Sequence, residues 1–536
     1  MIETIYLYHT LGGIGLRRKI KELGLLLFIL VVISGCSTSN NVTLESNDSK
    51  NGNGNEGTLI IARQSDVDNL DHHFMSTINA ASVTHGKVYE GLVARDKNEN
   101  IVPLLAESWE QVNDTTWEFH LQHGVTFHDG TPFNADAVKE TFERVLDPDL
   151  GAPKASAFEM VEEIKVLDDY TVQFKLSEPF SPLLSILASH EGGIINPKTI
   201  EKYKGEVIKE PNGTGPFTFE SWTPGQAIIL NKNQNYWGNP PHIDRVEFKV
   251  VPEETTRVSM IETGEAHIAE PLSIHMIETV ETSKKGNVYR SEGFGTEYLG
   301  FNMQALPFND VQVRKAISHA IEMDAIIDGA FNKIGHRANS LMGSKVFGYH
   351  EDLKAYEYNL NEAKRLLSAA GYANGFEATL LTMDNKERIN LAEILQSQLM
   401  GIGIKLNIQV LEYGSFVEQV NKGDSQLFLI SWRNATGDAD YNQYNLFHSS
   451  SHGATGNTLF YSNNEVDELI ELARAETDQE KRLELYAKAQ EIEMEDAAYV
   501  PVRVIENLAA VAKNVDHFSI SAAGYLEIND ILINKD

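Results

Sequence analysis

One short segment gathers side chains that could recognise a small charged molecule. It covers residues 431–447, with the sequence SWRNATGDADYNQYNLF, and follows an apolar run that predicts a buried strand. An arginine there can hold a carboxylate through two parallel hydrogen bonds, and an aspartate can pair with an amine. The alternative is a solvated, Asp-rich loop. We take five residues of this segment as candidate ligand-binding residues: Trp432, Arg433, Asp438, Asp440 and Tyr441.

Arg388 is a second candidate for holding a carboxylate. It precedes a predicted helix over Leu391–Met400, and the start of a helix favours an anion through its dipole and its free N–H groups. A salt bridge on the surface is the alternative. The chain carries 77 acidic and 45 basic residues. Two local arginines, Arg388 and Arg433, would therefore be needed to hold a ligand with two carboxylates.

The 17 histidines offer three groups that could ligate a metal: His72 with His73, His120 with His123 and His128, and His448 with His452. The last pair lies four residues apart, but the Ser and Gly residues around it favour a loop over a helix. On its predicted strand His120 points away from the apolar face, toward solvent. Surface or hydrogen-bonded histidines are the favoured interpretation. We predict neither a metal site nor a cofactor.

Motifs and charge disfavour several functions. The chain has no Gly-x-Ser-x-Gly elbow, no His-Glu-x-x-His pair and no Walker glycine loop. The single cysteine, Cys36, excludes an intramolecular disulfide and a cysteine-based zinc cluster. A formal net charge of −32 opposes contact with nucleic-acid phosphates. We therefore predict that the protein is not an enzyme and has no nucleic-acid partner.

Cys36 ends a pattern that is typical of a lipoprotein signal peptide. Four basic residues over 17–21 precede an apolar run over 23–33, which is too short to span a membrane comfortably. Two small residues then precede Cys36, as in a bacterial lipobox. A buried cysteine in an ordinary apolar helix is the alternative. We predict a signal peptide over 1–35, with Cys36 carrying the lipid that anchors the protein to the outer face of the plasma membrane.

Residues 36–57 are rich in Ser, Asn and Gly, which predicts a flexible tether. Beyond it, apolar and alternating runs predict strands over 58–62, 116–121, 170–176, 246–251, 404–411 and 428–432. Helical spacing and capping residues predict helices over 135–146, 313–321, 361–370, 391–400, 466–474 and 479–495. This alternation favours α/β lobes with largely parallel sheets.

Several motifs, in order, resemble those of the extracellular solute-binding family 5, which includes dipeptide-, oligopeptide-, glutathione- and nickel-binding proteins. The strongest lies over Ala106–Pro132, where a W-x-F-x-L strand is followed by F-x-D-G-x-P, a turn that depends on Gly and Pro. The resemblance covers nearly all of residues 58–536. Its further pieces are the runs EGL at 90–92, GTGPF at 213–217, NYWG at 235–238 and PFNDVQVRKAISHA at 307–320.

The resemblance implies an α/β, two-lobed periplasmic-binding-protein type II fold with an extra inserted subdomain in the first lobe. Lobe I would comprise residues 58–304, with the inserted subdomain over about 104–211. Lobe II would comprise residues 305–500, and residues 501–536 would return to lobe I. Two short crossings between the lobes would make a hinge.

The resemblance also implies a substrate-binding lipoprotein of an ABC importer, outside the cytoplasm. It would capture a short peptide or glutathione-like ligand in the cleft between the lobes and deliver it to permease subunits with a cytoplasmic ATPase. The loop after Trp432 would line the cleft, although the aspartate that anchors the amine in dipeptide binders is absent near Asn434. The stretch TGDADY looks closer to glutathione-binding members. A nickel or metal-chelate binding protein is the alternative. A signalling or chaperone-like lipoprotein and an extracytoplasmic enzyme are further alternatives.

Overall fold

The computed structural model describes residues 57–535. The predicted signal peptide over 1–35, the lipid-carrying Cys36 and nearly all of the tether over 36–57 lie outside the described residues. Within the described range, none of the helices is long and apolar enough to cross a membrane.

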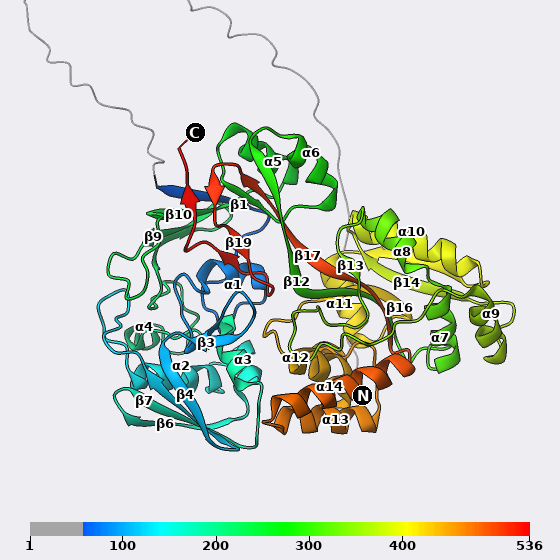
Figure 1. Cartoon of the computed structure of the whole chain (residues 1–536), viewed down its shortest axis with the longest axis horizontal. Coiled ribbons are helices and arrows are strands. Elements are labelled where there is room, and N and C mark those ends of the chain that lie inside the picture. Colours follow the sequence, from blue (N-terminus) through cyan, green and yellow to red (C-terminus); the bar gives the residue numbers. More distant parts are fainter. Residues whose placement is uncertain (1–56, 536) are drawn as a thin grey trace, which may run out of the picture. The chain divides into compact units, whose positions relative to one another are not determined.

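An eleven-stranded sheet runs through the described chain (Figure 1). Ten strands follow the order β15-β14-β16-β12-β17-β11-β1-β10-β9-β8, and β13 pairs with β17. Their bounds are β1 Thr58–Arg63, β8 Phe217–Thr223, β9 Ala227–Lys232, β10 Arg245–Val250, β11 Ile268–Glu270, β12 Gly286–Phe301, β13 His336–Arg337, β14 Glu377–Met383, β15 Lys405–Leu411, β16 Leu427–Trp432 and β17 Tyr499–Ala512. The predicted strands of this sheet are therefore present.

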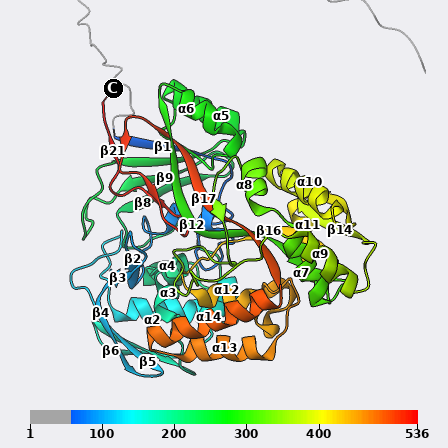
Figure 2. The ribbon, with the colours of Figure 1, turned by 45° about the vertical axis from the view of Figure 1, so that its right-hand side comes forward.

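The sheet is mixed rather than largely parallel. One parallel triplet is β11-β1-β10 and the other is β15-β14-β16. Between them lie two long antiparallel strands, β12 and β17, which stay paired from Gly286 with Ala512 to Gly300 with Tyr499. Both views show these two strands running side by side from one triplet to the other (Figures 1 and 2). Alternation of strands and helices predicted largely parallel sheets, which agrees with the two triplets but not with the antiparallel pair that joins them.

The two triplets pair with opposite ends of the long strands. Strand β16 pairs with β12 over Thr296–Phe301, whereas β11 pairs with β17 at Ala510 and Val511. The carboxyl ends of both triplets therefore point toward the middle of β12 and β17. The ladder is irregular there, with register shifts on β12 between Glu292 and Tyr298. Ligands of open α/β sheets bind outside the carboxyl ends of their strands, so this middle region is where a site is expected.

A separate four-stranded antiparallel sheet, β4-β5-β7-β6, has its own apolar core, whose buried residues extend from Leu92 to Ile194. Helix α2 contacts β6 and β7. The side chain of Asn134 caps this helix by accepting from the backbone N–H of Ala137. The remaining early elements are α1 Ile78–Thr84, β2 Val93–Arg95, β3 Ile101–Pro103, β4 Ala106–Asn113, β5 Thr116–Leu121, α2 Ala135–Leu146, β6 Val161–Asp168, β7 Thr171–Leu176, α3 Leu183–Leu187 and α4 Pro197–Lys202.

The remaining helices cover the large sheet and pack on one another. Helix α10 contacts β14 and β15, α5 contacts β11 and β17, and α12 and α14 both contact α13. Their bounds are α5 Glu254–Thr263, α6 Ile277–Thr282, α7 Val311–Ala320, α8 Met323–Phe331, α9 Leu360–Ala369, α10 Lys386–Met400, α11 Tyr413–Lys422, α12 Ala439–Phe447, α13 Asn464–Ala475 and α14 Gln479–Glu495. Short strands β18 Val515–Asp516, β19 Ser519–Ile520, β20 Leu526–Glu527 and β21 Leu532–Ile533 end the chain.

The early sequence motifs converge on one buried carboxylate, Glu90. It accepts hydrogen bonds from Thr214 Oγ1 at 2.7 Å, Tyr236 Oη at 2.7 Å and Trp237 Nε1 at 2.9 Å. A Cβ on Gly213 would overlap the carbonyl oxygen of Val88, so the close approach of these segments requires glycine. These motifs therefore hold the fold together. The predicted lobe boundaries at 304/305 and 500/501 stay a prediction.

Candidate functional site

A cavity of about 1030 Å³ lies at the middle of the two long strands, with walls from both parallel triplets. On one side, its lining follows the carboxyl ends of β1, β10 and β11 and includes Gln64, Glu254, Glu270, Leu272 and Ile274. On the other side, its lining follows β14, β15 and β16 and includes Asp384, Arg388, Glu412, Tyr413, Ser431 and Arg433. Its volume is that of a pocket for a small organic ligand.

Glu297 on β12 organises the positive side of this cavity. Its carboxylate accepts from Arg388 Nε at 2.9 Å and from Arg503 Nε at 3.0 Å. Burial opposes the ionisation of Glu297, but the charges of the two arginines outweigh it and hold its pKa below the ordinary value. Arg503 also lies 3.4 Å from Glu387. Both arginines are therefore fixed and largely neutralised before any ligand arrives.

Arg433 differs from its two neighbours. Arg433 is exposed and lines the cavity, and its side chain donates one hydrogen bond within residues 57–535, from Nη1 to Asn507 Oδ1 at 3.3 Å. No carboxylate of the described chain lies within ion-pair distance of it. In a protein with 77 acidic residues, an unpaired guanidinium in a cavity is unusual. Five donors in a planar fork make it suited to a carboxylate of a ligand.

Arg388 lies inside helix α10 and not before it, as the sequence had led us to expect. The helix begins at Lys386, capped by Asn385, whose side chain accepts from the backbone N–H of Arg388 at 3.1 Å. The guanidinium turns toward Glu297 and donates from Nη2 to Ser431 Oγ at 2.8 Å. Only 11% of its side chain is exposed. Arg388 thus reaches the cavity through its side chain rather than through a helix terminus.

Asp438 and Asp440 lie outside the cavity lining, and each contacts an arginine. Asp438 caps helix α12 and forms two hydrogen bonds with Arg482, of 2.8 and 3.0 Å. Asp440 lies 3.0 Å from Arg474. Burial raises the pKa of Asp440 to about 6, although Arg474 opposes this shift. Residues 439–447 are helical where the sequence predicted a loop, because these ion pairs tie the segment to later helices.

Trp432 and Tyr441 lie near each other, with ring centroids 5.6 Å apart and planes at 37°. Burial, and then the charge of Glu191, raises the pKa of the Tyr441 hydroxyl. Neither ring contributes to the lining of the large cavity. The structure therefore brings Arg388 and Arg433 together at the cavity and places the other four candidates of segment 431–447 beside it. The roles of all six stay a prediction.

Several cavity residues were not singled out from the sequence. Glu297, Arg503 and Asn507 come from the long strands, and Asp384 and Glu412 follow β14 and β15 directly. A residue that directly follows a predicted strand of a parallel sheet is a candidate site residue, and this signal could have identified Glu412. Strand β14 was not predicted, so Asp384 had no such signal. No local signal identifies Glu297 or Arg503, because their roles depend on pairing between distant strands.

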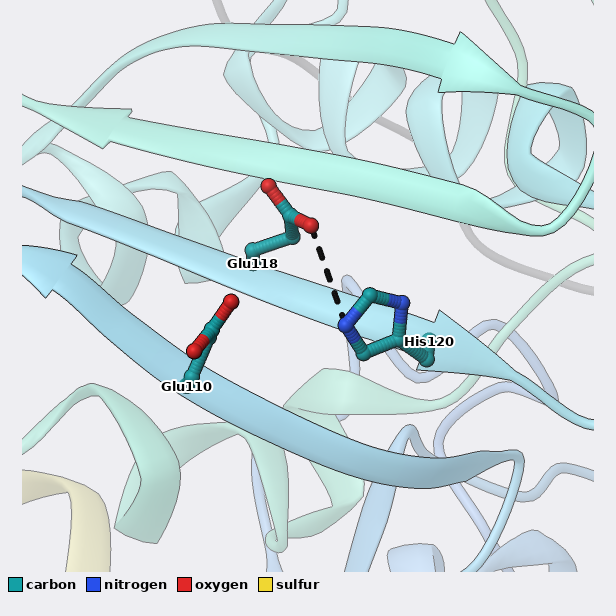
Figure 3. A group of neighbouring side chains, drawn as sticks. All are labelled: Glu110, Glu118 and His120. Carbon is teal, nitrogen blue, oxygen red and sulfur yellow. Dashed lines mark ion pairs between the residues drawn. The ribbon is translucent and has the colours of Figure 1, made fainter.

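Among residues 57–535, one group of acidic and histidine side chains could hold a metal ion: Glu110, Glu118 and His120 (Figure 3). Glu110 lies opposite Glu118 on neighbouring strands, and His120 Nε2 is 3.7 Å from Glu118 Oε1. The His120 side chain is 40% exposed, as expected for a strand position that faces solvent. The group lies on the four-stranded sheet and not in the cavity lining.

Comparisons with known proteins agree on one family. A sequence model described as bacterial extracellular solute-binding proteins, family 5 Middle, matches residues 100–454. The glutathione-binding proteins GsiB of Escherichia coli and Shigella flexneri are 30% identical over 471 residues, covering 86% of this chain and 92% of theirs.

Solved structures carry the same fold. One is the ABC transporter-associated periplasmic binding protein DppA from Helicobacter pylori in complex with the peptide STSA. It is 30% identical, with a TM-score of 0.77 over 89% of this chain and 98% of that one. NikZ from Campylobacter jejuni in complex with Ni(L-His) is 21% identical, with a TM-score of 0.76 over 88% and 97%. At that identity the likeness to NikZ shows the fold alone.

Proposed function

Because this chain belongs to the bacterial extracellular solute-binding proteins of family 5, we propose that it captures a short peptide or a glutathione-like ligand in the cavity between the two parallel triplets. Members of this family act outside the cytoplasm with ABC importers and bind solutes rather than transform them. The ligand would pass from the cavity to permease subunits that are driven by a cytoplasmic ATPase. Cys36 would carry the lipid anchor on the outer face of the plasma membrane.

Arg433 is the observation that carries this proposal. It faces the cavity without an ion-pair partner among the described residues, beside two arginines that Glu297 already binds. A carboxylate of the ligand would complete its coordination. Arg388 would support the same carboxylate, or a second one, from helix α10. Two relatives support a ligand of this kind: GsiB is named for binding glutathione, and DppA was crystallised with a peptide.

The alternative is a nickel or metal-chelate ligand. It draws on NikZ, which resembles this chain in fold, and on the group Glu110, Glu118 and His120. None of the described residues that line the cavity is a histidine or a cysteine, and the metal-ligating group lies on another sheet. A peptide-like ligand is therefore the proposal, and nickel is one arm of its test.

Calorimetry of wild type and Arg433→Gln tests the proposal, with glutathione, trialanine and nickel chloride as probes. Loss of one partner from a desolvated charged pair costs about 2–5 kcal/mol, or roughly 30- to several-thousand-fold in affinity. We expect such a loss for the preferred peptide. Arg365→Gln is the matched control, because that exposed arginine pairs only with Glu362 three residues earlier on α9. Its affinity should stay within twofold of wild type.

Two outcomes would contradict the proposal. Binding of the preferred peptide by Arg433→Gln within threefold of wild type would show that Arg433 does not hold its carboxylate. Binding of nickel alone, without either peptide, would favour the metal-chelate function instead.

A further inference from the structure

The charges that line the cavity change sign from its middle to one edge. Across the sheet, the strand order β15-β14-β16 brings Glu412, then Asp384 and finally Arg433 to the same end of three adjacent strands. In this sheet Met383 pairs with Leu411, and Leu381 pairs with Phe428. Extending the first pairing by one residue sets Asp384 level with Glu412. Extending the second by three residues sets Asp384 level with Ser431. The cavity is therefore acidic at the β15 edge and basic beside β16.

The acidic residues of the lining divide into two classes by their partners. Glu270, Glu297, Glu387 and Glu506 each have an arginine within ion-pair distance. Asp384 and Glu412 are exposed, and no basic side chain of the described chain pairs with either. The carboxylate of Glu412 accepts only the backbone N–H of Gly414, at 2.9 Å. Neither carboxylate is paired with a basic side chain of the described chain, although Glu412 is also the N-cap of helix α11, and the same cavity contains the unpaired guanidinium of Arg433.

The positions of these residues on the strands suggest a length for the ligand. Adjacent strands lie about 4.8 Å apart, so the point between Asp384 on β14 and Glu412 on β15 lies about 7 Å from β16. Arg433 lies two residues beyond the level of Asp384, or about 7 Å farther along its strand. Together these displacements separate the backbone of Arg433 from that point by about 10 Å. An extended chain spans about 3.3–3.6 Å for each residue, so a ligand of three residues has about this length.

From this charge map we infer that the cavity takes a zwitterionic ligand of tripeptide length, with its carboxylate on Arg433 and its ammonium group between Asp384 and Glu412. This inference rests on the proposed function and assigns the chemistry and direction of its ligand. Tyr413, which is 67% exposed and lies on the rim beside Glu412, would cover the amino-terminal side chain.

This assignment differs from the expectation that Asp438 or Asp440 binds the amine. Either aspartate would have to release the arginine that it contacts, and Asp438 has only 2% of its surface exposed. Breaking a buried ion pair leaves an uncompensated charge and opposes binding. Asp384 and Glu412 need no such exchange, because both line the cavity and neither has a basic partner in the described chain.

A chemical mutant cycle tests the inference. Trialanine and N-acetyl-trialanine, which lacks the ammonium charge, are titrated by calorimetry into wild type and into the double variant Asp384→Asn/Glu412→Gln. We expect acetylation to weaken binding to wild type about tenfold, and the double variant to lose a similar factor for trialanine. Acetylated trialanine should bind both proteins within threefold, because the interaction removed by the variant is already absent.

Glu377→Gln is the matched control, because Glu377 begins the same strand that Asp384 follows and pairs with Lys405 at the opposite end. Its affinities should equal those of wild type. Glu254→Gln tests the other wall, where Glu254 also lacks an ion-pair partner in the described chain and accepts from Ser273 Oγ at 2.9 Å. If the effect of acetylation on affinity disappears in Glu254→Gln and persists in the double variant, the ammonium group binds at Glu254 and the assignment is overturned.

The outcomes separate this inference from the proposed function. If trialanine binds wild type and acetylation changes its affinity less than threefold, the ammonium subsite is wrong while peptide binding stands. If the double variant binds both peptides more weakly than wild type by the same factor, the two carboxylates affect the fold and not the ammonium group. That result also contradicts the inference. If neither trialanine nor glutathione binds wild type, the proposed function fails, and the inference with it.

Discussion

Residue types alone identify the arginines of the cavity, but not what neutralises them. Arg388 and Arg433 were candidates because an acidic chain needs local arginines to bind carboxylates. The sequence does not predict that Glu297 occupies Arg388 and leaves Arg433 free, because Glu297 lies 91 residues from Arg388 along the chain. The difference between a bound arginine and an available one appears only when the strands are paired.

The same limit explains the aspartates of segment 431–447. Their spacing and polar neighbours suggest a binding loop, yet Asp438 contacts an arginine 44 residues later on another helix. Partners at such separations leave no local pattern. Glu412 could have been found, since it directly follows the predicted strand over 404–411, whereas Asp384 follows β14, a strand that the sequence analysis did not predict.

Buried histidines should make the protein unstable in acid. Burial lowers the pKa of His72 to about 4, and the pKa values of His73, His85 and His190 are also lowered, first by burial. Each is neutral in the folded protein, whereas the unfolded chain takes up a proton below about pH 6.5. These histidines therefore cost the folded protein no stability above pH 6.5, and the free energy of unfolding falls as pH falls from 6.5 toward 4. For His72 alone this fall amounts to about 3 kcal/mol.

Urea unfolding at pH 7.0, 5.5 and 4.5 measures this effect. We expect the free energy of unfolding to fall at each step, and His72→Asn to show a smaller fall than wild type. The control His120→Asn should keep the wild-type pH dependence, because His120 is 40% exposed. A stability that does not change between pH 7.0 and 4.5 would show that these histidines are not buried as neutral groups.

At the scale of elements, periodicity and capping predicted regular helices well. Helices α2 and α14 have the predicted bounds, 135–146 and 479–495, since both combine an N-cap side chain with sustained helical spacing. Helix α10 begins five residues before the predicted start, because Asn385 caps it ahead of the apolar stripe. Helix α12 was missed, because its Asp and Asn residues and the preceding Gly437 favour turns, and its stability comes from contacts with other helices.

The Asp438–Arg482 pair should anchor helix α12 to α14. We expect Asp438→Asn to lower the free energy of unfolding by about 3–5 kcal/mol, because it leaves the buried guanidinium of Arg482 without its partner. Asp478→Asn is the control. Asp478 also caps a helix, through Glu480 and Lys481, but it is exposed, and loss of a cap costs about 1 kcal/mol.

The same two variants also separate stability from recognition. If Asp438 is a structural anchor, Asp438→Asn should retain the wild-type affinity for trialanine under conditions in which it is folded. A loss above tenfold in affinity with an unchanged urea midpoint would instead favour the sequence-based expectation that Asp438 binds the ligand amine.

At the scale of the whole described chain, the long strands β12 and β17 are the connection through which the two sides of the cavity can move. Contacts across the cavity already join them, since Glu387 accepts from the backbone N–H of Ile274 at 3.4 Å. Farther away, the backbone N–H of Ser181 donates to the carbonyl of Arg474 at 2.8 Å. The resemblance implies a hinge with two crossings, which stays a prediction, and the paired strands β12 and β17 are the segments that would form it.

Ligand binding should therefore close the cavity. A ligand that contacts both walls binds the closed form better and shifts the population by that difference in affinity. Small-angle scattering with and without saturating trialanine measures the change, and we expect a smaller radius of gyration with ligand. An unchanged radius, in a sample shown by calorimetry to be saturated, would count against closure.

Attachment to the membrane should depend on Cys36. We expect Cys36→Ala to leave an unprocessed precursor that incorporates no labelled lipid, because the thiol is the group that becomes the thioether. A single acyl chain holds a protein only marginally, whereas two or more attach it stably. Normal cleavage and lipid labelling of Cys36→Ala in cells would contradict this prediction.

The identity of the molecule retained by the protein tests the central claim most directly. Gentle purification followed by native and denaturing mass spectrometry, on wild type and on Arg433→Gln, would report the mass of that molecule and its composition. The account predicts a short peptide or glutathione-like compound with a free amine and a carboxylate, present on wild type and depleted in the variant. A nickel chelate, or a ligand without a carboxylate that is retained equally by both proteins, would contradict it.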